Sequence, residues 1–168
     1  MLECLAIDFP TFYQRVNSGH GDPVDAILPP VAEHAIERVE QQLGFPLPES
    51  YKRFLRCTGG FCLLGGAVNL SFPPFIHDFP PFESLTSEQQ SRITGSWPPP
   101  SHGLLCFGDF WLEGDGDQVL FDTRQVIRDG EYPVLYYDHE AMPASIRPIA
   151  ASFHDWLERV LTEESFCA

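Results

Sequence analysis

Three short apolar runs between residues 104 and 138 limit what this chain can fold into. They read LLCFGDFWL, QVLFD and PVLYYD, they are rich in aromatic and β-branched residues, and glycine and aspartate divide them. Runs of this composition bounded by turn formers are typical of β-strands. This part of the chain therefore predicts a sheet.

The pair Asp115-Gly116 lies between the first two runs, in the stretch FWLEGDGDQVLFDT. A tight type I′ turn needs positive φ at both central positions, so Asp-Gly between apolar runs is a strong hairpin signal. With these two residues as the turn, all cross-strand pairs are apolar, and both faces of the ribbon require cover. The predicted pairs are Leu112 with Val119, Trp111 with Leu120, and Phe110 with Phe121.

The same stretch contains enough carboxylates to suggest an ion-binding loop. An EF-hand loop needs glycine at its sixth position and glutamate at its twelfth, where a loop starting at Asp115 has Leu120 and Val126. A calcium β-roll repeat does not fit either. The hairpin is favoured, and adventitious binding of a divalent ion by Glu113, Asp115 and Asp117 is the alternative.

Helical spacing appears in two stretches before the strands. PPVAEHAIERVEQQLGF follows a proline start and stops at Gly44, which predicts a helix over about 31–43. FPLPESYKRFLRCTGG predicts a short second helix with Pro48 in its first turn. The basic side of this second helix is either an ordinary solvated face or a contact surface; it consists of Lys52, Arg53 and Arg56.

The stretch SIRPIAASFHDWLERVLTEE carries an apolar stripe that predicts a last helix over about 147–162. Helices, then strands, then a helix predict an α+β fold. We expect a single domain over residues 1–168, because this length is cramped for two. Its sheet is predicted to be mixed or antiparallel, with about four to six strands flanked by N-terminal helices and a C-terminal helix.

The motif FPPF occurs twice, at residues 72–75 and 79–82. Proline removes a backbone donor, so we expect neither copy inside a helix or a central strand. If the copies form an exposed aromatic loop that docks a partner, Phe75 and Phe79 are candidate contacts. The favoured alternative is that the phenylalanines plug an edge of the sheet.

Charge restricts the function. The chain has 24 acidic and 10 basic residues, and its net charge of -14 argues against unaided binding to nucleic acid or to an anionic membrane. Half of this excess lies between residues 109 and 140, which favours a basic protein partner, although a merely soluble acidic surface is the alternative. The candidate contacts are Asp109, Glu113, Asp115, Asp117, Asp129 and Glu131.

The sequence has no recognisable catalytic motif: it lacks a G-x-S-x-G elbow, an H-E-x-x-H helix, a Walker loop and G-x-G-x-x-G. His139 stands between two acids, but consecutive strand residues point to opposite faces, so surface turn residues are favoured over a metal-dependent hydrolase. The five cysteines show neither a CxxC pair nor a zinc spacing. We expect no catalysis, no metal and no cofactor.

The first ten residues lack the basic segment of a signal peptide, and no apolar run approaches the ~18 residues of a transmembrane helix. With an odd number of cysteines, this fits a cytoplasmic protein with reduced thiols.

Several short motifs follow one another in an order typical of a known family. They are LGF at 43–45 after a Glu-rich helix, LPESYKRFL at 47–55, Gly59-Gly60, Gly116-Asp117, PVLYYDHE at 133–140 and AASFHDWL at 150–157. In this order the chain resembles the SMI1/KNR4 family of the SUKH superfamily, over about residues 31–161.

The resemblance implies an α+β fold and no catalytic constellation. Many bacterial members are immunity proteins, which bind and neutralise toxins, often nucleases or deaminases, whereas fungal members are linked to cell-wall regulation. We therefore expect a non-catalytic protein-binding domain, an immunity protein that masks a basic toxin domain with its acidic surface. The alternatives are an intracellular regulatory or scaffold module that binds an endogenous protein and, third, a metal-dependent enzyme using His139.

Overall fold

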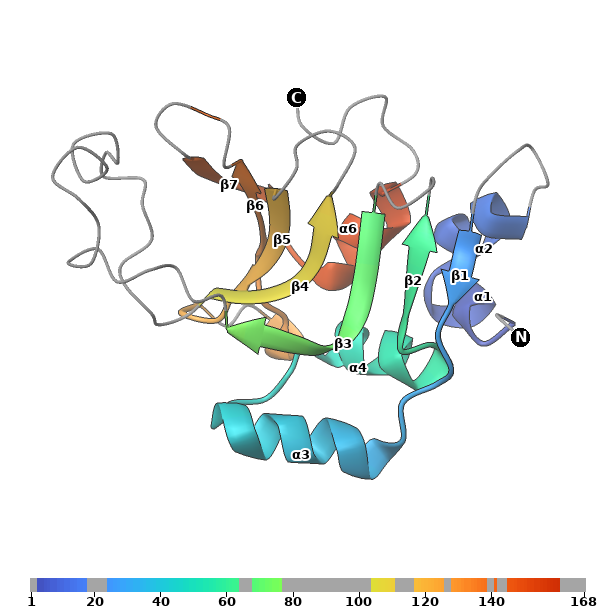
Figure 1. The fold of residues 1–168 in the computed structure, drawn as a ribbon, viewed down its shortest axis with the longest axis horizontal. Helices are drawn as coiled ribbons and strands as arrows, with labels where there is room; N and C mark the ends of the chain where they lie inside the picture. The colour runs from blue at the N-terminus through green and yellow to red at the C-terminus, as the bar shows by residue number, and fades with distance from the viewer. Residues whose placement is uncertain are drawn as a thin grey trace, which may run out of the picture.

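The computed structural model describes residues 3–17, 24–63, 68–76, 104–110, 117–125, 128–138, 141 and 145–160 (Figure 1). Its helices are α1 (Leu5–Asp8), α2 (Pro10–Asn17), α3 (Glu33–Leu43), α4 (Glu49–Cys57) and α6 (Phe153–Arg159), with a 3-10 turn at Arg128–Gly130. Its strands are β1 (Val24–Ile27), β2 (Gly60–Leu63), β3 (Val68–Ile76), β4 (Leu104–Phe110), β5 (Asp117–Asp122), β6 (Val134–Asp138) and β7 (Ser145–Ala150).

The seven strands form one sheet in which their order follows the chain, from β1 to β7. Every neighbouring pair is antiparallel. In Figure 1, α4 and α6 lie behind the sheet, α1 and α2 lie beside β1, and α3 crosses below it. The predicted α+β class is confirmed, and the sheet is antiparallel, with seven strands rather than four to six.

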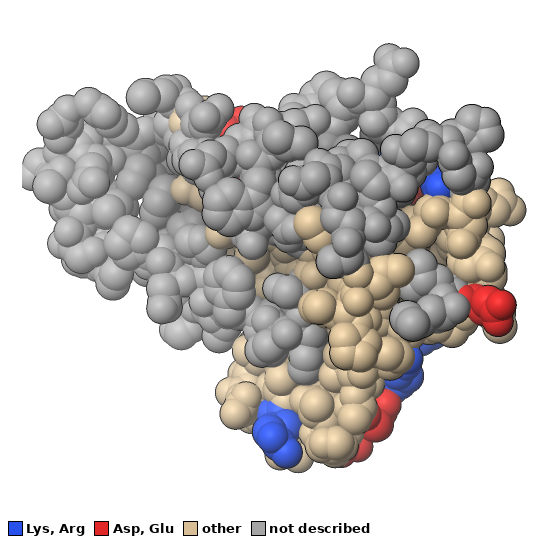
Figure 2. Space-filling view, turned by 45° about the vertical axis from the view of Figure 1, so that its right-hand side comes forward, with Lys and Arg blue, Asp and Glu red and all other residues tan. Residues whose placement is uncertain are grey.

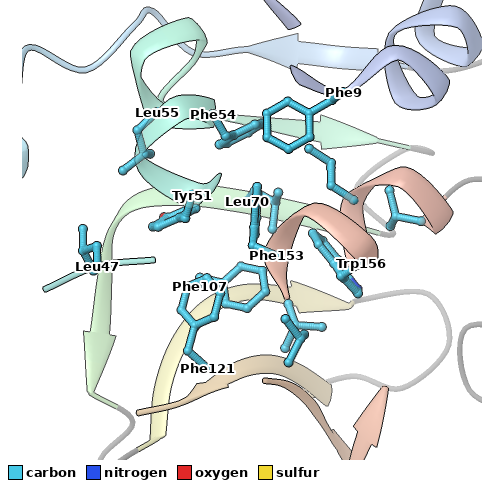
Figure 3. Close-up of a cluster of buried hydrophobic side chains, with 14 of the residues drawn as sticks. Phe9, Leu47, Tyr51, Phe54, Leu55, Leu70, Phe107, Phe121, Phe153 and Trp156 are labelled. Atoms are coloured by element: carbon cyan, nitrogen blue, oxygen red, sulfur yellow. The ribbon is translucent and has the colours of Figure 1, made fainter. Parts of the chain in front are cut away.

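One aromatic core joins the helices to the sheet (Figure 3). Tyr51 and Phe54 of α4 are spaced one helical turn apart, so both point toward the sheet. Tyr51 lies 5.3 Å from the ring of Phe121 on β5 and 5.0 Å from that of Phe153 on α6. Phe107 and Phe121, on neighbouring strands, stack with their centroids 4.0 Å apart. These contacts fix α4 and α6 on the same face.

The N-terminal residues form α1, α2 and β1, which no clear pattern in the sequence predicts. Leu5, Phe9 and Phe12 are buried in the main core. Helix α2 begins with Pro10, which has no N–H group to satisfy. The next two N–H groups, of Thr11 and Phe12, donate to the carboxylate of Glu158 on α6, each at 3.1 Å. A side chain from the other end of the chain thus caps this helix.

Helices α3 and α4 confirm the two predicted N-terminal helices. Gly44 ends α3 with a φ of 78°, the left-handed conformation that favours glycine at this position. Helix α4 follows Pro48, whose side chain cannot accept a hydrogen bond. The helix therefore takes its cap from a distant residue, Glu131, which accepts the N–H of Ser50.

The last helix begins at Phe153 rather than near residue 147, so the predicted start is wrong. Residues Ser145–Ala150 instead form β7, which pairs with β6 at one edge of the sheet. The side chain of Ser152 accepts a hydrogen bond from the N–H of Asp155 at 3.1 Å and fixes the start of α6. The apolar stripe thus spans two elements.

The predicted pairing of β4 with β5 is correct, but its register is wrong. Phe110 pairs with Asp117, and Phe121 pairs with Leu105 rather than with Phe110. A bulge between Cys106 and Gly108 also shifts the ladder by one residue. Asp115-Gly116 lies outside the described residues.

Both faces of this strand pair are covered, as predicted. Phe107, Val119 and Phe121 belong to the main core, whereas a second buried cluster lies on the opposite face. That cluster consists of Leu104, Cys106, Leu120 and Leu135.

The first FPPF copy, residues 72–75, lies within β3, third of the seven strands. The prediction that neither copy occupies a central strand is therefore wrong for this copy. Pairing with β2 ends at Ser71, and the ladder to β4 shifts between Leu70 and Phe75. The prolines are thus tolerated because the ladder is interrupted where they lie. The second copy lies outside the described residues.

Candidate protein-binding surface

The described acids between residues 109 and 140 fall at two ends of the sheet. Asp117 begins β5 and Asp122 ends it, which separates them by roughly 17 Å along the strand. Asp109 pairs with Gln118 and so lies at the first end. Asp129 and Glu131 follow the second end, in the connection from β5 to β6. The backbone therefore does not bring these candidates together at one place.

Asp117 is buried, with 4% of its surface exposed. The hydroxyl of Tyr136 on β6 donates a hydrogen bond to its Oδ2. Burial, followed by the negative charges of Asp117 and Asp138, raises the pKa of the neighbouring Tyr137. The fold therefore encloses the carboxylate of Asp117, which is not exposed as a contact residue would be.

Glu131 caps helix α4. Its Oε1 accepts the N–H of Ser50 at 2.7 Å, and its Oε2 accepts the Ser50 hydroxyl at 2.6 Å. Beside it, the hydroxyl of Tyr132 donates to the carbonyl of Pro46 at 3.0 Å. These bonds anchor the β5–β6 connection to the start of α4, so Glu131 has a structural role in addition to its predicted one as a contact residue.

Asp129 is exposed and lies in the 3-10 turn with a φ of 62°, next to Gly130 with a φ of 75°. Among the eight candidate contacts it is the one whose side chain is described and exposed. For Asp109 and Phe75 the structure gives the strand position alone. Glu113, Asp115 and Phe79 lie outside the described residues.

The basic side of α4 forms ion pairs with neighbouring helices. Arg56 binds Glu33 of α3 through two hydrogen bonds of 2.8 Å, and the hydrogen bond from Arg56 lowers the pKa of Glu33. Lys52 lies 3.0 Å from Glu49 and 3.4 Å from Glu40. The cations on this side of α4 are therefore paired within the fold.

Arg53, on the same side of α4, lies 3.7 Å from Asp8 of α1. Figure 2 shows acidic and basic side chains next to one another along the lower right margin of the visible described surface. This part of the surface is of mixed charge rather than uniformly acidic.

Within the described part of the chain, no three His, Cys, Asp or Glu side chains gather as a metal site would require. None of the described helices is long and apolar enough to cross a membrane. His139 and Glu140 lie outside the residues that the structure describes.

These features define a class of protein: an α+β domain with a seven-stranded antiparallel meander and helices packed on one face through an aromatic core. The model of the SMI1/KNR4 family (SUKH-1) matches residues 30–159, and the chain belongs to this family. The match runs from the segment before α3 to the last residue of α6, so α1, α2 and β1 precede it. No curated protein is similar enough in sequence to add to this comparison.

The capping roles of two acids could not be predicted from the sequence. Glu158 is 147 positions from Thr11, and Glu131 is 81 positions from Ser50, so no local pattern joins them. The Ser152 cap could have been found, because a serine followed three residues later by an acid is a helix-start signal. That signal would also have separated β7 from α6.

Proposed function

We propose that this protein is a non-catalytic protein-binding domain of the immunity type. It neutralises a toxin domain of the nuclease or deaminase kind by covering a basic surface of that domain with acidic side chains. Membership of the SMI1/KNR4 family supports a binding role. The observation that carries the proposal is the balance between the acids and the cations available to neutralise them.

The cations of the described helices and strands are largely engaged within the fold. Lys52, Arg53 and Arg56 pair with acids of α1, α3 and α4, and Arg124 forms a two-point contact with Asp122 at 2.7 and 2.9 Å. With 24 acids against 10 basic residues, 24 − 10 = 14 negative charges have no internal counterpart. Counterions or a basic partner must balance them.

A toxin that acts on nucleic acid carries a positive cleft, because it must bind phosphates. A folded acidic surface competes with the nucleic acid for this cleft and is drawn to it by long-range attraction. The contact set proposed here is Asp109, Glu113, Asp115 and Asp129. Asp117 and Glu131 are left out because their carboxylates are used inside the fold.

The two ends of the sheet are compatible with one partner. An interface of ordinary size covers about 800 Å² on each protein, which is wide enough to include groups roughly 17 Å apart. The contacts should therefore be tested as two groups, with Asp109, Glu113 and Asp115 neutralised together and Asp129 neutralised alone.

The test is a pulldown from the native host with the tagged full-length chain, followed by mass spectrometry. We expect to recover a basic toxin domain, whose gene lies next to that of this protein. Binding of the purified pair is then measured from low to high salt, and association should slow as salt screens the attraction. Neutralising exposed Glu37 of α3 is the matched control for loss of one charge.

An affinity that stays constant across this salt range would contradict the electrostatic role. A neutral endogenous partner, encoded by a gene far from this one, would favour the regulatory or scaffold function instead. In that case, replacing Phe75 and Phe79 should weaken binding more than neutralising the acids does.

A further inference from the structure

The side chain of Gln118 on β5 has an enclosed oxygen that accepts no hydrogen bond. The residue is 9% exposed, its Oε1 is buried, and no group of the described chain donates to that oxygen. Turning the amide over would put its nitrogen in the same place, so one amide atom stays unpaired in either orientation. Because buried polar groups nearly always have a partner, this oxygen calls for a donor from outside the described fold.

Gln118 is the middle residue of a row across β4, β5 and β6. It pairs with Asp109 on one side and with Tyr137 on the other. Tyr137 packs against the second buried cluster, which contains Leu120, and Gln118 lies two residues before Leu120, so both are on that face of the sheet. Directly opposite residues of an antiparallel pair share a face, with Cβ atoms about 5 Å apart. The amide of Gln118 therefore stands between an acidic and an aromatic strand position.

The charge at this end of the sheet is negative. Asp117 directly precedes Gln118, and Asp138 ends β6 beside them. Arg147 of β7 serves the opposite face, where its guanidinium lies 5.2 Å from the ring centre of Tyr136, a residue of the main core. A donor that carries a positive charge is therefore favoured at Gln118 over a neutral one.

We propose that this end of the sheet receives an arginine side chain of the partner, whose guanidinium donates to Oε1 of Gln118 and to the carboxylate of Asp109. A guanidinium is planar and presents N–H groups along more than one edge, so it bridges two acceptors on neighbouring strands better than the compact ammonium of lysine does. Guanidinium also stacks on aromatic rings, and Tyr137 supplies one next to Gln118. The inference rests on the proposed function, since it names the group by which a basic partner is recognised here.

The unpaired oxygen gives stability and binding opposite responses to one substitution. A buried acceptor without a donor lowers the stability of the free protein, and an apolar side chain of similar length removes that cost. Gln118→Met should therefore raise the unfolding midpoint by about 2–5 °C while it abolishes the contact with arginine. The matched control is Gln42→Met on the exposed side of α3, which should change neither property.

The experiment titrates the isotope-labelled full-length protein with N-acetyl-arginine amide and follows the side-chain amide signals of Gln118 by NMR. The spectrum of Gln118→Met identifies these signals by their absence. We expect a saturable shift at millimolar probe, a shift about threefold smaller with N-acetyl-lysine amide, and none with the neutral citrulline analogue. The backbone amide of Tyr137 should shift in the parent protein but not in Gln118→Met, and Asp109→Asn should weaken the affinity about threefold.

Three results would overturn the proposal. They are Gln118 signals that arginine leaves unmoved, equal shifts with the arginine and lysine probes, and a shift at Tyr137 that survives in Gln118→Met. A lower midpoint for Gln118→Met would do the same, because Oε1 would then be paired in the free protein.

The comparison of the three probes uses the unaltered chain, so it stands even if a variant folds poorly. It is also separate from the test of the proposed function. Failure with the arginine probe leaves the toxin proposal to be decided by the pulldown, and a pulldown that recovers no basic toxin leaves the arginine result in place.

Discussion

Acidic side chains serve the fold differently in two regions of this molecule. At the starts of α2 and α4, Glu158 and Glu131 come from distant parts of the chain and each accepts two hydrogen bonds. Between α3 and α4, Glu33 and Glu49 pair with cations at the surface. The charge is the same. The first two carboxylates accept hydrogen bonds from N–H groups at the starts of two helices, whereas the second two form ion pairs at the surface.

The difference shows why a count of acids does not locate a binding surface. Removing the acceptor of a buried donor leaves that donor unsatisfied, whereas an exposed ion pair is screened by water and salt. Acids of the first kind are used by the fold and are not available to a partner. The binding surface must therefore be built from acids that the fold does not use.

The largest effect is expected for Glu131→Ala. Ser50 is 1% exposed, and both its N–H and its hydroxyl lose their acceptor in this variant. We expect the free energy of unfolding to fall by about 2–3 kcal/mol, measured by urea denaturation. Glu131→Gln should recover part of the loss, since its amide oxygen still accepts. A fall no larger than that of Glu37→Ala would erase the distinction between the two regions.

Glu158→Ala should have the next largest effect, about 1–2 kcal/mol, because two N–H groups of α2 lose their cap but can turn toward water. Amide hydrogen exchange should quicken in residues 11–17 while β5 and β6 stay protected. If exchange rises equally throughout the molecule, Glu158 supports the whole core rather than the start of α2.

Elements defined by neighbouring residues were predictable from the sequence. The proline start and Gly44 bound α3 to within two residues, and the apolar spacing of Tyr51 and Phe54 identified α4 and its buried face. Both signals act within a few residues, where backbone geometry and helical period decide the outcome. The close spacing of the acids in the candidate site could also be found from the sequence alone.

Features that depend on distant residues were not predictable. Ile146 and Ile149 fit a helical stripe, but pairing with β6 places them in β7. The register of β4 with β5 differs from the predicted one already at Phe110, which pairs with Asp117, and a bulge near Cys106 shifts it by one more residue. For the candidate site, only the sheet shows that Asp117 and Asp122 lie at opposite ends of a strand, and only contacts across the fold show which acids are enclosed.

The ion pairs of Lys52 with Glu40 and Glu49 are expected to contribute less to the free energy of unfolding. Lys52→Met removes the contacts to Glu40 and Glu49, and we expect a loss of about 0.5–1 kcal/mol at low salt that shrinks as salt is added. Burial alone would raise the pKa of Glu49, but its hydrogen bonds and charge contacts with Lys52 and Arg56 outweigh this and lower it from 4.5.

The sign of the pH dependence follows from that lowered pKa. A carboxyl whose pKa is depressed by folding stabilises the protein above its unfolded value of 4.5, and this contribution is lost as pH falls through the folded value. The difference in unfolding midpoint between the parent protein and Lys52→Met should therefore be constant from pH 7 to about 5 and shrink below 4.5. A difference that stays the same below pH 4.5 would show that the lysine acts by packing and not through its charge.

The smallest effect on stability is expected for Asp129→Asn, and this variant separates binding from folding. Asparagine, like aspartate, tolerates the left-handed conformation at a φ of 62°, so the turn should persist and the unfolding midpoint should not change. If Asp129 contacts a basic partner, the association rate should drop by about twofold at low salt, because one exposed charge steers encounter only weakly. Glu131→Gln should do the reverse, lowering stability while leaving association intact. Should Asp129→Asn destabilise the protein as Glu131→Gln does, the acids of the β5–β6 connection all serve the fold, and the contact surface must be sought at the other end of the sheet, around Asp109.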